Sequence, residues 1–249
     1  MDEKDYRMIR FFNQLKKTID QRNIKSIGII TDKDGTIIIN EELKAILQEI
    51  KSKKTQTDIH IIANTGRTVA DMISALKKEK IPLKYFDYII GDNGATCLDV
   101  KKNEEVFKNK MDVNDINAVI EEFISRGGNI ANIRLADGEH IYAYDLPEIR
   151  EYYKKNKNVI FKQSFDDLED MDITKLTLSG ENRLILDIKG YIEKVLKKGK
   201  AHLGQTSFPQ KKDNNYRVDF TRRKYKRNSS KICEKKREYR CLYIFRKWF

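Results

Sequence analysis

Three short apolar runs in the N-terminal part of the chain constrain its fold more than any other feature. Ser26–Thr31, Ile59–Ala63 and Tyr88–Ile90 are rich in β-branched residues, and each ends in a polar or glycine-containing turn. Unbroken apolar runs of this length suit strands that are buried on both faces of a sheet. Apolar residues at helical spacing in 41–53 and 69–78 place amphipathic helices between these strands. We therefore predict an α/β fold with a Rossmann-like, doubly wound parallel core sheet.

The turn after the first run carries the strongest chemical signal. Its sequence over residues 32–36 is Asp-Lys-Asp-Gly-Thr, and ligands bind where the strands of open α/β sheets end. Asp32 could attack a phosphoryl group while bound to a cation, and Asp34 could handle the proton of the leaving group. Gly35 permits a tight turn that brings backbone N–H groups to phosphate oxygens. The alternative is a polar turn that only caps the following helix.

The three strand ends together carry a family resemblance. The strand followed by residues 32–36 resembles the first motif of haloacid dehalogenase-like phosphatases. Residues 64–67 (Asn-Thr-Gly-Arg) resemble the second motif of subclass IIB, the Cof-type group. Residues 92–95 (Asp-Asn-Gly-Ala) resemble that group's Asn-Gly-Ala motif, after which an α+β cap domain of the C2 type is inserted. The three motifs are specific for superfamily and subclass, but not for the substrate.

The resemblance implies a role for each matching residue. Asp32 would be the nucleophile that forms an aspartyl-phosphate, Asp34 would be the general acid and then base, and both would hold Mg²⁺. Thr65 would donate a hydrogen bond to the transferring phosphoryl group. Mg²⁺ suits an all-oxygen site that water and phosphate complete. For Arg67, capping of its own loop is an equal alternative to substrate contact. The full set predicted to bind substrate or phosphate is Gly35, Thr36, Thr65, Gly66, Arg67 and Asn93.

The pattern of the sequence changes after Ala95, where helical patterns alternate with strand patterns that occur in pairs. Turn residues between paired strand patterns indicate hairpins, and hence an antiparallel sheet. We predict three parts, namely core domain at 1–95, α+β cap at 96–221 and a basic aromatic tail at 222–249. The expected helices are 3–23, 113–125 and 146–155, and the expected strands are 130–135, 141–144, 174–179 and 216–220.

Residues 222–249 carry most of the net charge of +12. They contain 12 Lys or Arg and 2 Asp or Glu, whereas the preceding 221 residues contain 38 and 36. The body of the protein is therefore nearly neutral, and no nucleic-acid partner is expected for it. The tail also lacks two motifs that the resembled family has after its cap. One is a lysine on a short helix, and the other is a Gly-Asp/Asn motif whose acidic group completes the magnesium site.

A shifted reading frame would explain this tail. When codons typical of an A+T-rich gene are read one nucleotide later, the end of the chain becomes Val-Tyr-Ile-Phe-Leu-Gly-Asn-Gly-Phe. That string is a strand running into the missing Gly-Asn motif, and the same shift makes 221–234 compatible with a Lys-Gly that opens an amphipathic helix. We hypothesise that the frame slips near Thr221. The chain would then be an impaired phosphatase for a small phosphorylated metabolite, with its first strand left as an exposed edge.

The alternative is that the tail is native. Its cations are interleaved with aromatic residues, which suits binding to RNA or to an anionic membrane surface. The protein would then be a non-catalytic, degenerate member of the same fold family.

Other features of the sequence favour a cytoplasmic protein. No apolar run reaches the roughly 18 residues of a membrane span, and the charged start of the chain lacks a secretory signal. Cys97, Cys233 and Cys241 show no metal-ligand spacing, which fits free thiols in a reducing compartment. The oligomeric state leaves no mark on the sequence.

Overall fold

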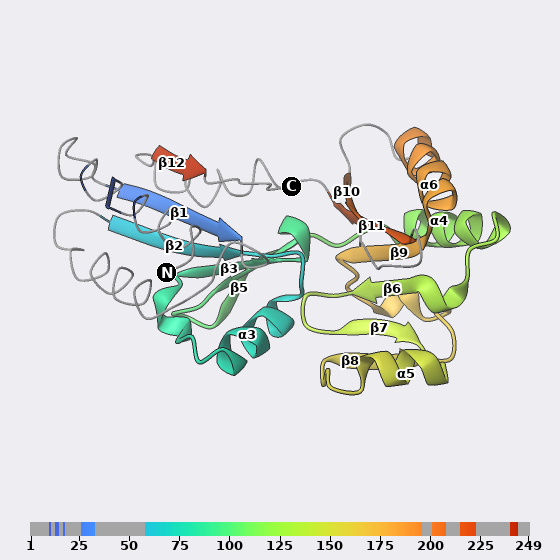
Figure 1. The fold of residues 1–249 in the computed structure, drawn as a ribbon, viewed down its shortest axis with the longest axis horizontal. Helices are drawn as coiled ribbons and strands as arrows, with labels where there is room; N and C mark the ends of the chain where they lie inside the picture. The colour runs from blue at the N-terminus through green and yellow to red at the C-terminus, as the bar shows by residue number, and fades with distance from the viewer. Residues whose placement is uncertain are drawn as a thin grey trace.

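The structure is a computed structural model of the chain, in which two lobes lie side by side (Figure 1). It describes residues 58–195 without a break, and also 26–32, 201–207, 215–222 and 240–243. Of the predicted helix at 3–23, only Arg10, Asn13, Gln14 and Lys17 are described, and all four are helical. The predicted helix at 41–53 lies outside the described residues.

The first lobe contains a six-stranded sheet in the order β12-β1-β2-β3-β4-β5. The first four strands are parallel, and β4 and β5 are antiparallel additions at the edge. The register pairs Asp32 with Asn64 and Asn64 with Ile90, so the carboxyl ends of β1, β2 and β3 meet at one edge. The predicted α/β class is confirmed. The strands are β1 (Ser26–Asp32), β2 (Asp58–Asn64), β3 (Tyr88–Gly91), β4 (Thr96–Asp99), β5 (Glu104–Lys108) and β12 (Arg240–Tyr243).

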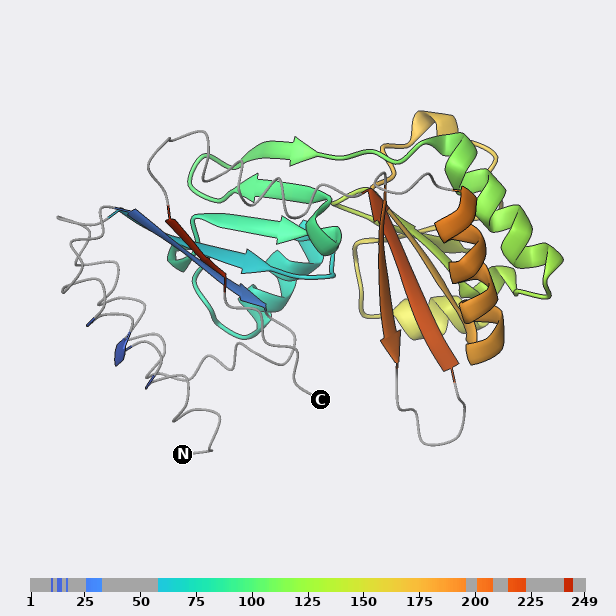
Figure 2. The ribbon, with the colours of Figure 1, turned by 90° about the horizontal axis from the view of Figure 1, so that it is seen from above.

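Apolar side chains on alternate positions build the core of this lobe. Ile30, Ile62, Ile90 and Cys97 come from four neighbouring strands and form one buried cluster. Helix α3 (Val69–Lys78) lies against the sheet (Figure 2). Its Met72 and Leu76, four residues apart, are fully buried. Thr68 caps this helix, since its Oγ1 accepts a hydrogen bond from the Asp71 amide at 3.1 Å. A 3₁₀ turn, η1 (Leu83–Tyr85), leads from the helix into β3.

The first sheet extends beyond the predicted domain boundary. We predicted that the cap begins at residue 96, but β4 and β5 continue the core sheet through Lys108. The turn η2 (Asp92–Gly94) reverses the chain and returns it alongside β3 as an antiparallel strand. The start of the cap is therefore corrected to a position after Lys108.

The prediction that β1 lies at an exposed edge is also corrected. Strand β12, which comes from within the predicted tail, runs parallel to β1 with Leu242 opposite Ile29. Its short Cys-Leu-Tyr stretch lets the backbone of β1 complete a hydrogen-bonded ladder on this side. The rest of the tail after Arg222 lies outside the described residues.

The second lobe contains the α+β cap, and its sheet has the order β10-β11-β9-β6-β7-β8. All pairs are antiparallel except β7 with β8. Helices α4 (Val113–Ser125) and α6 (Asn182–Val195) lie together on one face of this sheet (Figure 2). The remaining elements are η3 (Ile130–Asn132), β6 (Ile133–Ala136), β7 (Ile141–Tyr144), α5 (Pro147–Tyr153), β8 (Val159–Lys162), η4 (Leu168–Asp170), β9 (Lys175–Glu181), β10 (Ala201–Ser207) and β11 (Asn215–Arg222).

The core of the cap forms between its sheet and the helix pair. Phe123 of α4, Leu135 of β6, Leu176 of β9 and Ile188 of α6 are at most 1% exposed and belong to one cluster. The periodicity of α4 and β7 predicted their bounds correctly. It missed β8, β10 and α6, although Ile185, Ile188 and Ile192 of α6 recur at helical spacing and are buried in this cluster. Among the helices that the structure describes, none combines the length and apolar character needed to cross a membrane.

Candidate active site

The predicted site residues that the structure describes lie at the carboxyl edge of the parallel strands. The turn Thr65–Arg67 follows β2, and Asp92 and Asn93 follow β3. Asp32 ends β1 and is next to Asn64 in the register, although only its backbone is described. The predicted residues Asp34, Gly35 and Thr36 lie outside the described residues.

Backbone hydrogen bonds join the turn after β2 to the turn after β3. The Asp92 amide donates to the Arg67 carbonyl at 2.8 Å, and the Asn93 amide donates to the Thr65 carbonyl at 3.2 Å. Within the first turn, the Arg67 amide donates to Thr65 Oγ1 at 3.1 Å. Thr65 itself is buried, with 2% of its surface exposed. These contacts fix the turn that carries the predicted phosphate-binding hydroxyl.

Local sequence explains the shape of both turns. Asp92, Asn93 and Gly94 have φ of 49°, 54° and 99°, all in the left-handed region. Asp, Asn and Gly are the residues that adopt this region most readily. A Cβ atom on Gly66 would lie 2.8 Å from Asn93 Oδ1, so a larger residue there would displace the Asn93 side chain.

A lysine from the cap reaches both turns. Lys175, at the start of β9, places its Nζ 2.6 Å from the Gly66 carbonyl oxygen and 3.0 Å from Asp92 Oδ1. Thr174 Oγ1 lies 2.9 Å from the other Asp92 oxygen. Burial raises the pKa of Asp92, while the Lys175 charge and the hydrogen bonds from Lys175 and Thr174 oppose that shift. Burial is the larger effect, so the pKa of Asp92 stays above its ordinary value and the contacts with the cap offset only part of the cost of burying this carboxyl group.

Sequence reasoning missed this lysine and threonine. They are 82 or more positions from their partners in the first lobe, so no local pattern connects them. The available signal was weak, because Lys175 and Thr177 alternate with Leu176 and Leu178 like the polar positions of an ordinary half-exposed strand.

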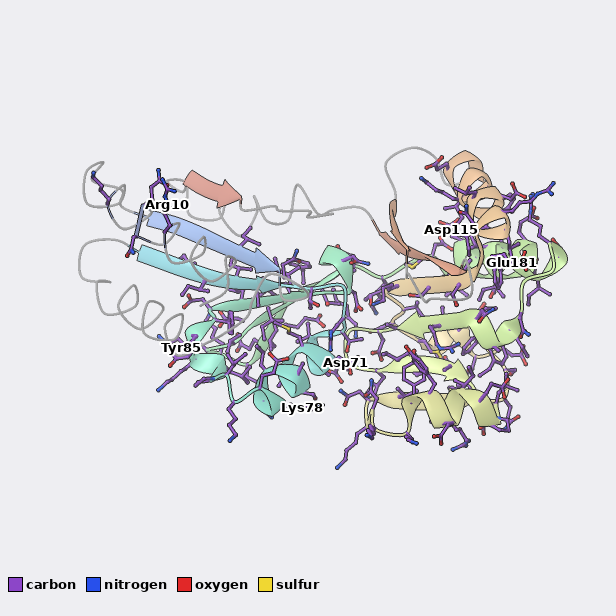
Figure 3. The ribbon with its side chains drawn as sticks, viewed as in Figure 1. Arg10, Asp71, Lys78, Tyr85, Asp115 and Glu181 are labelled. Carbon is purple, nitrogen blue, oxygen red and sulfur yellow. The ribbon has the colours of Figure 1, made fainter. Side chains whose placement is uncertain are left out.

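A second set of contacts joins the cap to the start of α3. The Val69 amide donates to the Gly138 carbonyl at 2.9 Å. Asp71 Oδ1 accepts hydrogen bonds from Asn156 Nδ2 at 3.2 Å and from Asn158 Nδ2 at 3.1 Å. Figure 3 shows Asp71 on the part of α3 that faces the cap. The two lobes are therefore joined beside the predicted phosphate-binding turn and also away from it.

The β6–β7 hairpin turn meets the first lobe at this second contact. Asp137 accepts hydrogen bonds from the His140 amide at 2.6 Å, the Glu139 amide at 2.9 Å and the Tyr142 hydroxyl at 2.7 Å. Partial burial alone would raise the pKa of Asp137, but these hydrogen bonds outweigh it and lower that pKa. A charged Asp137 therefore holds the hairpin turn in shape.

The predicted metal ligands begin with Asp32 at the end of β1. In the part of the chain that the structure describes, no three His, Cys, Asp or Glu residues gather closely enough to hold a metal ion. Of the predicted ligand pair, Asp34 is not described and Asp32 is described only in its backbone. The backbone nevertheless places residue 32 opposite Asn64, so the end of β1 and the turn that carries Thr65 lie at the same edge of the sheet.

Comparisons with known proteins agree on one family. A family model described as haloacid dehalogenase-like hydrolase matches residues 29–231. The fold is similar to that of a haloacid dehalogenase-like hydrolase from Bacteroides thetaiotaomicron. The TM-score is 0.59 at 16% identity, over 85% of this chain and 76% of that one.

Two further solved structures share the fold. A haloalkanoate-superfamily phosphatase from the same organism gives a TM-score of 0.58 at 15% identity, over 81% of this chain and 68% of that one. The protein TM0651 from Thermotoga maritima gives 0.55 at 19% identity, over 86% of this chain and 78% of that one. The sequence itself matches no curated protein.

Proposed function

The chain belongs to the haloacid dehalogenase-like hydrolases, and we propose that it is a phosphatase for a small phosphorylated metabolite. The proposal includes a reaction through an aspartyl-phosphate on Asp32. We also propose that the chain as it stands hydrolyses its substrate poorly. The supporting observation is the meeting of the carboxyl ends of β1, β2 and β3 at one edge of the sheet, where the backbone of Asp32 adjoins the hydrogen-bonded turn Thr65–Arg67.

The proposed reaction proceeds in two steps. Asp32 attacks phosphorus and forms an acyl phosphate, while the bond from phosphorus to the leaving oxygen breaks and Asp34 protonates that oxygen. Asp34 then takes a proton from water, which attacks phosphorus, releases inorganic phosphate and regenerates the Asp32 carboxylate. Thr65 donates a hydrogen bond to the phosphoryl oxygens as their charge develops.

Other residues of the site bind the phosphate or the rest of the substrate. Gly35 and Gly66 allow backbone N–H groups to approach phosphate oxygens, because neither has a side chain that would keep the ligand away. Thr36, Arg67 and Asn93 are proposed to contact the substrate. The side chain of Arg67 is exposed, which supports this role. Its backbone N–H and carbonyl groups, in contrast, already form hydrogen bonds within the two turns.

Asp32 and Asp34 would hold Mg²⁺, for which carboxylate oxygens are suitable hard ligands. The bound ion would spread the negative charge of the transferring phosphoryl group. We expect weak binding, because the acidic motif that completes this site in the resembled family is missing from residues 222–249. The same absence is the reason for the proposed impairment. The shifted reading frame near Thr221 remains our explanation for it.

Hydrolysis of an aryl phosphate by two versions of the chain tests the proposal. One version is the chain as it stands, and the other has the reading frame restored after Thr221. We expect magnesium-dependent hydrolysis that is at least tenfold faster in the restored version and is abolished in both by Asp32→Asn. If neither version hydrolyses the ester, the phosphatase assignment is wrong.

The second candidate is a non-catalytic protein whose basic tail binds nucleic acid or an anionic membrane. The 12 cations in residues 222–249 favour it, whereas Arg240–Tyr243 are engaged as a core strand. Salt-sensitive RNA or vesicle binding that is lost on truncation at Thr221 would support it. The cytoplasmic location stays a prediction from the sequence.

A further inference from the structure

The peptide unit between Gly66 and Arg67 is held at both of its polar ends. Its carbonyl oxygen accepts a hydrogen bond from Lys175 Nζ at 2.6 Å. Its N–H group donates to Thr65 Oγ1 at 3.1 Å. Because a peptide unit is planar, these two groups point in opposite directions and rotate together. A donor that fixes the carbonyl therefore also fixes the direction of the N–H group.

The neighbouring carbonyls of this turn are held in a different way. The Thr65 carbonyl accepts from the Asn93 amide and the Arg67 carbonyl accepts from the Asp92 amide, both backbone contacts within the first lobe. The Gly66 carbonyl, which lies between them, accepts from a side chain of the cap. The orientation of this central peptide unit thus depends on the second lobe.

We propose that Lys175 is a positioning residue for the Thr65 hydroxyl. Lys175 holds the Gly66–Arg67 peptide plane, and the Arg67 N–H group then occupies a lone pair of Thr65 Oγ1. The hydroxyl proton of Thr65 is thereby directed to an oxygen of the phosphoryl group. This role rests on the proposed function, since it assumes that Thr65 binds that group.

Asp92 supports this role by holding the Lys175 side chain in place, with its Oδ1 3.0 Å from the lysine Nζ. The lysine and aspartate side chains are 7% and 0% exposed, so neither charge is solvated by bulk water. Thr174 holds the second Asp92 oxygen at 2.9 Å. The cap therefore contributes an ammonium group whose position is fixed before any substrate arrives.

A purely structural ion pair is the competing explanation, and a double variant separates the two. In Lys175→Met/Asp92→Asn both charges are removed, so no unpaired charge remains buried and stability recovers relative to Lys175→Met alone. Asn suits the left-handed backbone at position 92. The Gly66 carbonyl, however, still lacks its donor. A positioning role predicts that folding recovers while the phosphate-binding turn remains perturbed.

Hydrogen exchange of the Arg67 amide in the full chain measures directly how firmly its hydrogen bond to Thr65 Oγ1 is held. In the double variant we expect exchange faster by about fivefold to tenfold, the effect of losing one hydrogen bond. We also expect inhibition of aryl phosphate hydrolysis by inorganic phosphate to weaken by a similar factor. The exchange measurement needs no turnover, so it tests the positioning role of Lys175 even if the chain fails to hydrolyse the ester.

Asp71→Ala is the matched control. It removes the cap contacts of Asn156 and Asn158 without touching the turn at Thr65–Arg67. We expect unchanged exchange at Arg67 and unchanged phosphate inhibition. Equal acceleration in Asp71→Ala, or normal Arg67 exchange in the stable double variant, would overturn the proposal and leave Lys175 as a structural contact.

Discussion

Lys175 Nζ and Asp92 Oδ1 lie 3.0 Å apart across the boundary between the two lobes, in side chains that are 7% and 0% exposed. Two charges buried this deeply are stable only as a pair, because each alone would lose its hydration without compensation. The same lysine contacts the Gly66 carbonyl. The pair therefore connects the stability of the lobe boundary to the shape of the proposed phosphate-binding turn.

Breaking this ion pair from one side is expected to destabilise the protein strongly. Lys175→Met leaves Asp92 buried and unpaired, which costs about 3–5 kcal/mol in the free energy of unfolding. Urea unfolding followed by circular dichroism measures this change. Lys175→Met/Asp92→Asn should recover more than half of the loss. A loss below about 1 kcal/mol in the single variant would show that water solvates the pair.

Gly66→Ala tests the close approach of the two turns. The added Cβ would lie 2.8 Å from Asn93 Oδ1, and we expect overpacking to cost about 1–3 kcal/mol in stability. Adding Asn93→Gly removes the obstructing side chain and tolerates the backbone at φ 54°. Thermal unfolding of the single and double variants measures both effects. If the double variant is no more stable than Gly66→Ala, the clash with Asn93 is not the cause.

Asp137 gives the cap hairpin a defined pH dependence. Hydrogen bonds to its carboxylate lower its pKa in the folded state, so the folded state binds this proton less readily than the unfolded state. The stabilisation is present above the ordinary aspartate pKa of about 3.9 and is lost as the pH falls through the lower folded value.

A comparison of the chain with Asp137→Asn isolates this contribution. We expect the variant to be less stable at pH 7, with the difference shrinking as the pH falls below about 4. Unfolding by urea at a series of pH values gives this difference directly. A difference that grows on acidification would mean that the carboxylate is not stabilised by the hairpin turn.

Cys97 is expected to be unreactive in the folded protein. It is 1% exposed, and burial, with a smaller effect from Asp99, raises its pKa to about 12. Iodoacetamide at pH 8 should modify it only in denaturant, because the thiolate is the reactive form. Peptide mapping by mass spectrometry reports this cysteine separately from the other two. Rapid labelling of the native chain would contradict its burial.

Strand β12 can be tested by two truncations. Removing residues 240–249 takes away the strand that pairs with β1 and should expose an apolar edge, which favours aggregation. Removing only 244–249 retains β12 and serves as the control. Light scattering during purification compares the two. Equal solubility of both truncated chains would mean that β12 contributes little to the sheet.

The sequence was sufficient to predict the local elements that carry the site. Short apolar runs predicted β1, β2 and β3 because a strand buried on both faces needs apolar residues at successive positions. Helical spacing predicted α3 and α4 with their observed bounds. The order of strand-end motifs also predicted the family that the comparisons show. These features are local, so the sequence contains them in full.

Only the tertiary structure decided which distant residues meet. The pairing of β12 with β1 depends on backbone hydrogen bonds, and a four-residue strand that begins with Arg240 is too short and too polar to be predicted from its own sequence. The contact of Lys175 with Gly66 spans 109 positions, and neither residue has a neighbour in sequence that indicates the other. The sequence by itself thus determined the strands, helices and turn chemistry. Packing of the cap against the core decided the partners of the buried charges, because only folding brings those groups out of water together.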